Sequence, residues 1–271
     1  MSSPTGPTPT PPKPQQYSAP EPAMIAPTGP GLTEPQRLMN VFFAPGKTFE
    51  DLKRNDSWWV PWLVTAVFTL IFAVIAMQKI DMPRFIQQQT DRSPMAQKQL
   101  ERLTPEQRAQ NTTIRIAVTK VAFYAAPVFS LIIGLICAAV LMAIFNFFLG
   151  AEVPFSRAMG VVFYSGLTGI LATILLTISL LVTADTSTID FAGNPMPTNP
   201  GFFLDPDGNK VLYGLASSLD IFRIWYVILL GLGFAKVSSN RKPSVNTGIT
   251  TAFVAYGILV LIGIGFKVMF S

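Results

Sequence analysis

The chain has 271 residues, of which 50% are hydrophobic and only 13% are charged. A soluble domain carries about 25% charged residues, so this composition argues against a soluble enzyme and indicates a membrane protein. The absence of histidine excludes Ser-His catalysis and histidine-ligated zinc, and the single cysteine excludes an intrachain disulfide. The basic residues behind the net charge of +5 are scattered between apolar runs, so we expect no nucleic-acid partner.

Residues 1–35 form a proline-rich stretch with 11 prolines and few apolar side chains to bury. This composition predicts a disordered tail with polyproline II character in places. The stretch lacks the basic start and the apolar core of a secretory signal. We interpret it as a tether; a docking segment for a proline-binding module is the alternative.

Residues 36–57, called the pre-span segment below, mix apolar and basic side chains ahead of the first long apolar run. Leu38, Phe42, Phe49 and Leu52 lie among four lysines and arginines. The mixture predicts a segment in the membrane interface, with apolar groups at the headgroup boundary and basic groups near the phosphates. Contact with lipid or a partner, and simple anchoring of the first span, are both open.

Five apolar runs predict an all-α fold, a polytopic membrane helical bundle with five transmembrane helices over residues 58–271. A helix of about 20 residues crosses about 30 Å of hydrocarbon. Trp58 and Trp59 open the first run, where an aromatic belt is expected, and Pro127 predicts a kink in the second. The expected spans are about 58–78, 117–149, 158–184, 219–237 and 249–267.

The fourth span is the weakest because its uncharged part is short. It becomes long enough by starting near Leu219, with Arg223 inside its first turns. Asp220 suits the positive end of this helix, and Ser217 or Ser218 is expected as the cap. Asp220 and Arg223 share a helix face and can pair, and both a functional and a structural role remain open for them.

The charges of the links predict an orientation. Link 236–247 has three basic residues and no acid, whereas link 185–220 has five aspartates and one lysine. The positive-inside rule therefore puts the N-terminus in the cytoplasm and the C-terminus outside. Segment 79–120 does not fit the rule. It carries eight basic and four acidic residues, yet it lies outside in this orientation.

Helix starts are visible within that segment. Ser93-Pro94 and Thr104-Pro105 each combine a hydroxyl cap with proline at the first helical position. We expect two short polar helices, the second of which runs into the second span.

Other polar and small residues predict packing or turns. Asp205 opens a stretch that resembles a calcium loop, but the twelfth position is Ala216 instead of glutamate, so a turn is expected. We find no catalytic set, metal site or cofactor site. Close helix packing or interhelical hydrogen bonds are expected at Asn146, Ser165, Gly166, Gly169, Gly231, Gly233, Gly257, Gly263 and Gly265.

Two stretches carry recognisable motifs. The first is Phe43-Ala44-Pro45-Gly46-Lys47-Thr48-Phe49-Glu50-Asp51-Leu52, followed by Trp58-Trp59-Val60-Pro61. The second begins Ser218-Leu219-Asp220-Ile221-Phe222-Arg223-Ile224-Trp225 and ends with glycines before Ala235. Together they resemble bacterial members of the Yip family, the Ypt-interacting-protein-like membrane domain, over residues 36–270. The candidate functional or packing residues are Pro45, Phe49, Trp58, Trp59, Pro61, Asp220, Arg223 and Trp225.

The resemblance implies the fold and topology of that family, whose eukaryotic members act as membrane partners of Rab-type GTPases and have a cytoplasmic N-terminus. We expect a non-enzymatic scaffold in the plasma (inner) membrane of a bacterium, in contact with the lipid bilayer and with other membrane proteins or itself. The alternative is a transporter or a transporter subunit that acts as an oligomer. It rests on the glycine-rich spans and the short, charged fourth span, which resemble interrupted helices near transport sites.

Overall fold

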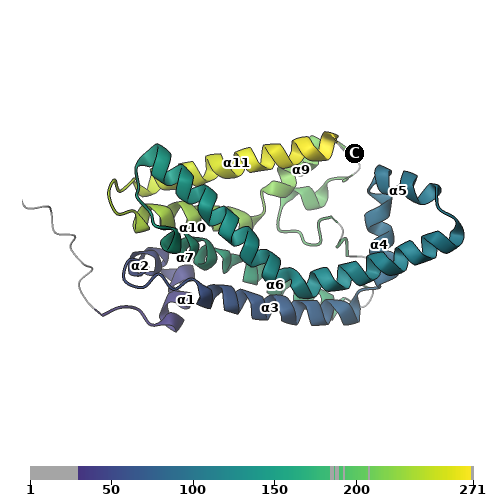
Figure 1. Ribbon diagram of the computed structural model, residues 1–271, viewed down its shortest axis with the longest axis horizontal. Helices are drawn as coiled ribbons and strands as arrows, with labels where there is room; N and C mark the ends of the chain where they lie inside the picture. The colour runs from purple at the N-terminus through teal and green to yellow at the C-terminus, as the bar shows by residue number, and fades with distance from the viewer. Residues whose placement is uncertain (1–29, 184–185, 187–188, 192, 207, 270–271) are drawn as a thin grey trace, which may run out of the picture. The chain divides into compact units, whose positions relative to one another are not determined.

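The computed structural model describes residues 30–183, 186, 189–191, 193–206 and 208–269, and the compact unit discussed below starts at Gly31. The described residues are helical, with no strand among them, so the predicted all-α class is confirmed (Figure 1). In chain order the elements are α1 (Glu34–Phe43), α2 (Pro45–Asp51), α3 (Trp59–Lys79), α4 (Met82–Asp91), α5 (Pro94–Glu101), α6 (Pro105–Leu149), α7 (Phe155–Gly166), α8 (Thr168–Val182), η2 (Pro200–Phe203), α9 (Lys210–Ser218), α10 (Ile221–Val237) and α11 (Val245–Met269).

Four helical stretches are long and apolar enough to cross a membrane, namely α3, α6, α7 with α8, and α11. A fifth crossing results if α9 and α10, which are bent by 59° at their junction, count as one span. The predicted membrane helical bundle is therefore confirmed, with four candidate spans, or five if the bent pair counts as one.

The proline-rich tail predicted for residues 1–35 lies outside the described residues up to residue 29. Its predicted end is wrong, because α1 already begins at Glu34. Thr33 and Gln36 form a capping box in which each side chain accepts from the other residue's backbone N–H. This pair satisfies free N–H groups of the first turn and starts the helix before the tail was expected to end.

The pre-span segment folds into α1 and α2, and its apolar side chains do not all face the headgroup region. Phe49 and Leu52 are fully buried in the core that α7 and α10 share. A methyl group added at Gly233 in α10 would touch the Phe49 ring at 3.1 Å. The interfacial interpretation is therefore wrong for Phe49 and Leu52, because helix packing removes them from any contact with lipid.

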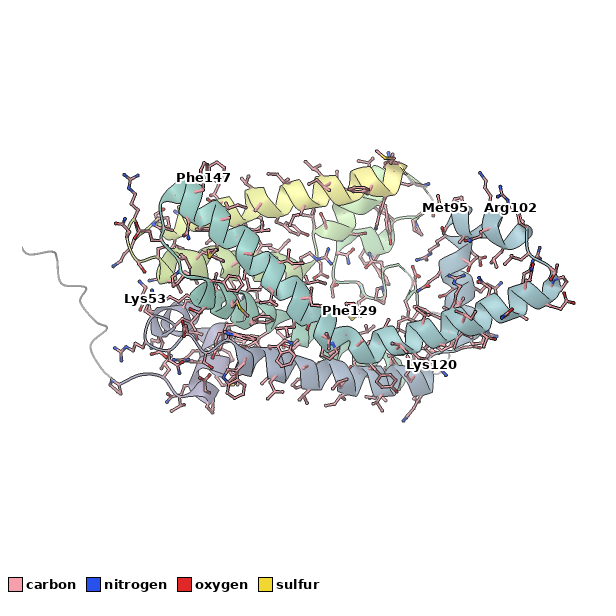
Figure 2. The ribbon with its side chains drawn as sticks, viewed as in Figure 1. Lys53, Met95, Arg102, Lys120, Phe129 and Phe147 are labelled. Carbon is pink, nitrogen blue, oxygen red and sulfur yellow. The ribbon has the colours of Figure 1, made fainter. Side chains whose placement is uncertain are left out.

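The predicted second span, residues 117–149, is the C-terminal part of a longer helix. α6 has 45 residues, which at 1.5 Å per residue is roughly 68 Å, about twice the hydrocarbon thickness. Thr104 caps it with Pro105 at the first position, so the predicted polar helix does run into the second span. The helix changes direction beside Phe129, just after Pro127, as the predicted kink requires (Figures 1 and 2).

Two short helices precede α6, and only one was expected. Ser93 caps α5, as predicted. α4 was not predicted; Asp81 caps it by accepting from the Arg84 N–H. Both helices lie at the end of the bundle opposite α1 and α2 (Figure 1), which we call the far end.

The glycines predicted to allow close packing fall into two groups. Gly231 and Gly233 do so, since an added methyl at Gly231 would lie 2.4 Å from the Ile249 Cα atom in α11. At five other predicted positions no described atom beyond the nearby backbone of the same helix lies within 4 Å of such a methyl, so that prediction is wrong for Gly166, Gly169, Gly257, Gly263 and Gly265. Hydropathy does not say which side of a helix faces a neighbour.

Two predicted interhelical hydrogen bonds are also absent from the described residues. Asn146 pairs with both backbone groups of Val153 in the α6–α7 link, at 3.0 and 2.7 Å, instead of reaching another span. The hydroxyl of Ser165 is buried without a hydrogen-bond partner.

Candidate functional site

Three segments far apart in the sequence meet at one end of the bundle, called the pre-span end below. They are the pre-span segment, the α6–α7 link and the α10–α11 link. The Ser239 N–H donates to the Ala151 carbonyl at 3.0 Å, and Arg157 at the start of α7 donates to the Ser239 hydroxyl at 3.0 Å. Lys236 at the end of α10 forms a 2.7 Å ion pair with Glu50 of α2.

A buried ionic network fastens α1 to α2. Arg37 is only 2% exposed, and its guanidinium lies 2.7 Å from a carboxylate oxygen of Asp51, which is 7% exposed. Glu34 contacts the same guanidinium at 3.3 Å and accepts a 2.7 Å hydrogen bond from the Tyr164 hydroxyl of α7. Thr48 closes the group by donating to the Arg37 carbonyl at 3.1 Å.

Arg37 keeps its charge despite burial. Burial acts to lower the pKa of Arg37, but its interactions with Asp51, Tyr164 and Glu34 together outweigh this and raise that pKa above its ordinary value. Buried ions are tolerated where partners satisfy them with good geometry. Because Glu34 links this group to Tyr164, the pre-span segment is tied to the membrane-spanning part as well as to itself.

The aromatic residues singled out from the sequence are spread over the same end. Phe49 is buried against α10, and Trp225 in α10 meets the Phe42 ring edge-on at 5.9 Å. Trp58 stacks at a tilt on Phe163 of α7, with ring centres 5.6 Å apart.

The remaining candidates of this group lie at helix starts. Pro45 occupies the first position of α2 and Pro61 is buried in the first turn of α3, whereas Trp59 is exposed. The functional role predicted for these candidate residues stays a prediction.

Asp220 and Arg223 lie at the junction of α9 and α10, away from the pre-span end. Asp220 itself is the cap of α10, because its carboxylate accepts from the N–H groups of Phe222 and Arg223. The expected cap at Ser217 or Ser218 is therefore wrong. The chain bends after Ser218, so these serines belong to the end of α9.

The predicted side-chain pairing of Asp220 with Arg223 is not found among the described ion pairs. Arg223 is exposed, and the Thr198 hydroxyl bonds to the second oxygen of the Asp220 carboxylate. The carboxylate thus joins the 183–209 link to the start of α10.

We expect the change Asp220→Ala to lower the free energy of unfolding by about 0.5–2 kcal/mol, the usual cost of a lost helix cap. Asp220→Asn keeps an oxygen acceptor and should change stability by only a few tenths of a kcal/mol. SDS titration of the purified protein in mixed micelles measures both. Equal stability of the alanine variant and the unchanged protein would contradict the capping role.

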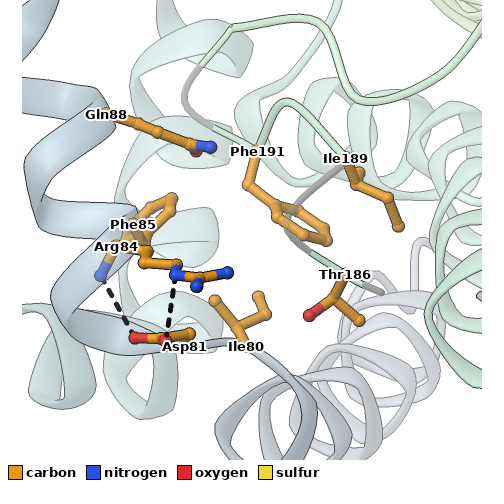
Figure 3. A pocket seen from close by; sticks show the side chains of 8 residues that line it. All are labelled: Ile80, Asp81, Arg84, Phe85, Gln88, Thr186, Ile189 and Phe191. Carbon is orange, nitrogen blue, oxygen red and sulfur yellow. Dashed lines mark hydrogen bonds and ion pairs between the residues drawn. The ribbon is translucent and has the colours of Figure 1, made fainter. Parts of the chain in front are cut away.

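Two hollows lie at the far end. The smaller, between α4 and the 183–209 link, has a cavity volume of about 10 Å³, room for about one water molecule (Figure 3). Asp81 and Arg84 on its wall already bond to each other. The larger hollow has about 390 Å³ and is lined by Asp190, Asn194 and Tyr213, among others. Asp190 is already paired with Arg92 at 2.5 Å.

The central residues of the pre-span end were not predicted from the sequence. Arg37 and Val41 lie four apart and are both buried, as are Thr48, Asp51 and Leu52 on one face of α2. Charged residues in register with the buried face of a short helix are the signal that would have identified them.

The helical fold and its apolar spans define a multi-pass membrane protein. The sequence profile of the Yip1 domain matches residues 39–264, which is most of the chain. The chain therefore belongs to the Yip1 domain family, as the motifs around Phe49 and Trp225 predict. Comparisons with curated proteins and with solved structures give no match.

Proposed function

We propose that the protein is a non-enzymatic membrane scaffold whose pre-span end holds partner membrane proteins or further copies of the chain. The observation that carries the proposal is that hydrogen bonds and an ion pair join the pre-span segment, the α6–α7 link and the α10–α11 end of the bundle into one surface. Family membership supports it, because the Yip1 family is not known for catalysis.

The outer face of α1 supports partner binding at this surface. Phe43 is 79% exposed and Met39 is 59% exposed, although the network around Arg37 fixes the helix that carries them. Because the backbone of α1 is already fixed, a partner that binds these apolar side chains does not have to offset the entropy cost of ordering it.

Site-specific photo-cross-linking tests the proposal in native membranes. A photoreactive amino acid at Phe43 should give a discrete, reproducible cross-linked product. The same probe at Met95, an apolar residue of similar exposure on α5 at the far end, is the matched control (Figure 2). Absence of any discrete product from Phe43, or an identical product from Met95, would overturn the scaffold.

A transporter, alone or as an oligomeric subunit, is the second candidate. The break between α9 and α10 and the hollow of about 390 Å³ lined in part by Tyr213 of α9 favour it. Against it, Asp220 already occupies the helix start that would otherwise face an anionic substrate. A purified protein that is monomeric by native mass spectrometry, with no hydrated path to the midplane, would exclude it.

For the topology we propose five crossings in the inner membrane of a bacterium, with the N-terminus in the cytoplasm. The three segments that meet at the pre-span end then share one side, as their mutual hydrogen bonds require. At the other side Thr186 donates to the Lys79 carbonyl, and Arg92 pairs with Asp190. These contacts support a common side for segment 79–120 and link 185–220.

A further inference from the structure

Three cations from segments far apart in the sequence form a cluster at the pre-span end. Lys53 comes from the α2–α3 link, Arg157 from the first turn of α7 and Lys242 from the α10–α11 link. None of the three forms an ion pair among the described residues. Two acids at this end have other partners. Glu50, whose charge also acts on Lys53, forms an ion pair with Lys236 at 2.7 Å, and Glu152 accepts a 2.7 Å hydrogen bond from Asn240.

The fold holds these cations close together in spite of their repulsion. Leu52, the neighbour of Lys53, packs on α7, where a methyl group added at Gly160 would lie 3.1 Å from it. Arg157 is fixed by its hydrogen bond to Ser239, which brings the α10–α11 link to the start of α7. Burial lowers the pKa of the Lys53 ammonium below its ordinary value. Repulsion from Lys242 and Arg157 adds to this, whereas the charge of Glu50 acts in the opposite direction. Like charges gathered in excess of nearby acids cost free energy, which a bound anion lowers.

The start of α7 adds to the positive potential. Pro154 precedes the helix and provides no side-chain acceptor, and the first turn contains Arg157 but no acid. The free N–H groups of a helix start favour an anion, whereas a cation at that position is unfavourable. The cations and the start of α7 therefore both favour an anionic ligand.

The position of these cations next to membrane-spanning helices indicates where the anion comes from. Arg157 lies in the first turn of a membrane-spanning helix, and Lys53 precedes α3 by a few residues. Trp59 and Phe155, exposed aromatic residues of the kind found at the membrane boundary, flank the cluster in sequence. We propose that Lys53, Arg157 and Lys242 bind the phosphate of an anionic phospholipid, in addition to the scaffold role proposed above.

The test uses the full chain in nanodiscs of phosphatidylglycerol and phosphatidylcholine in a 3:7 ratio. Native mass spectrometry after release counts the phosphatidylglycerol that stays bound. The variant Lys53→Ala/Arg157→Ala/Lys242→Ala should retain at least about tenfold less, since each cation near an anionic surface contributes roughly fivefold. The control Lys98→Ala/Arg102→Ala/Lys120→Ala removes the same charge from the far end and should retain it unchanged (Figure 2).

Equal losses in both triple variants, or no preference of the unchanged protein for phosphatidylglycerol, would overturn the proposal. In pure phosphatidylcholine discs, inorganic phosphate at millimolar concentration should not raise the melting temperature. A rise equal to that given by phosphatidylglycerol would assign the site to a free anion instead. If the triple variant does not fold, the single change Lys53→Gln must still lower phosphatidylglycerol retention in the unchanged background.

Discussion

Replacing Arg37 with alanine is expected to lower the free energy of unfolding by roughly 3–5 kcal/mol, because it leaves the buried Asp51 carboxylate without its partner. Asp51 is 7% exposed and lies 2.7 Å from the guanidinium, so water cannot take over that role without opening the α1–α2 contact. Loss of the Arg37 guanidinium also removes the ion-pair partner of Glu34, the residue that accepts the hydrogen bond from the Tyr164 hydroxyl. SDS titration in mixed micelles measures the effect.

The matched control for this change is Lys47→Ala, which removes an exposed cation from the same segment and should change stability by less than about 0.5 kcal/mol. The double variant Arg37→Leu/Asp51→Leu removes both charges and should regain most of the lost stability, since no buried ion is left unpaired. Wild-type stability of the single variant would refute the role given to the network.

A single methyl group at Gly231 should separate α10 from α11. In Gly231→Ala the new methyl would lie 2.4 Å from the Ile249 Cα atom and 2.7 Å from the Gly248 carbonyl oxygen. Both obstacles are backbone, so no side chain can rotate away, and the helices must move apart. Overpacking of this kind costs about 1–3 kcal/mol and occasionally more, and the effect is read from SDS titration and from the melting temperature in detergent.

Gly263→Ala provides the comparison, because no described atom beyond the nearby backbone of α11 lies within 4 Å of the added methyl. Alanine is the better helix former by up to about 1 kcal/mol, so this variant should be as stable as the unchanged protein or slightly more stable. If both alanine variants were equally stable, the close approach of α10 and α11 at Gly231 would be disproved.

The sequence predicts the membrane-spanning helices and several of their starts, because long apolar runs and local caps are signals that need no distant partner. Thr104 and Ser93 begin their helices as expected, and Pro127 bends α6. Residues 185–220 were expected to be a link, so neither α9 nor the 59° bend between α9 and α10 was predicted. Ser217, Ser218 and Asp220 interrupt the apolar side chains there, a pattern that fits the end of a link as well as a bend within a span.

The pre-span end could not be predicted in the same way. Large apolar side chains are found both in helix cores and in contact with lipid. The identity of Phe49 and Leu52 therefore does not tell a buried position from a lipid-facing one. The partners of Arg37 and the charged neighbours of Lys53 depend on which helices pack together, and this information is spread over distant parts of the chain. The family resemblance, which the profile match over residues 39–264 confirms, assigned no partner to any charged residue.

The contacts of α2 impose an order on biosynthesis. Arg37 and Asp51 are 14 residues apart and can meet as soon as α2 leaves the ribosome, whereas Glu50 and Lys236 are separated by 186 residues. Phe49 therefore has no complete pocket until α10 has been synthesised and inserted. A nascent chain cut short before α10 would keep this aromatic side chain uncovered, a mark by which quality-control proteases can distinguish unfinished copies from finished ones.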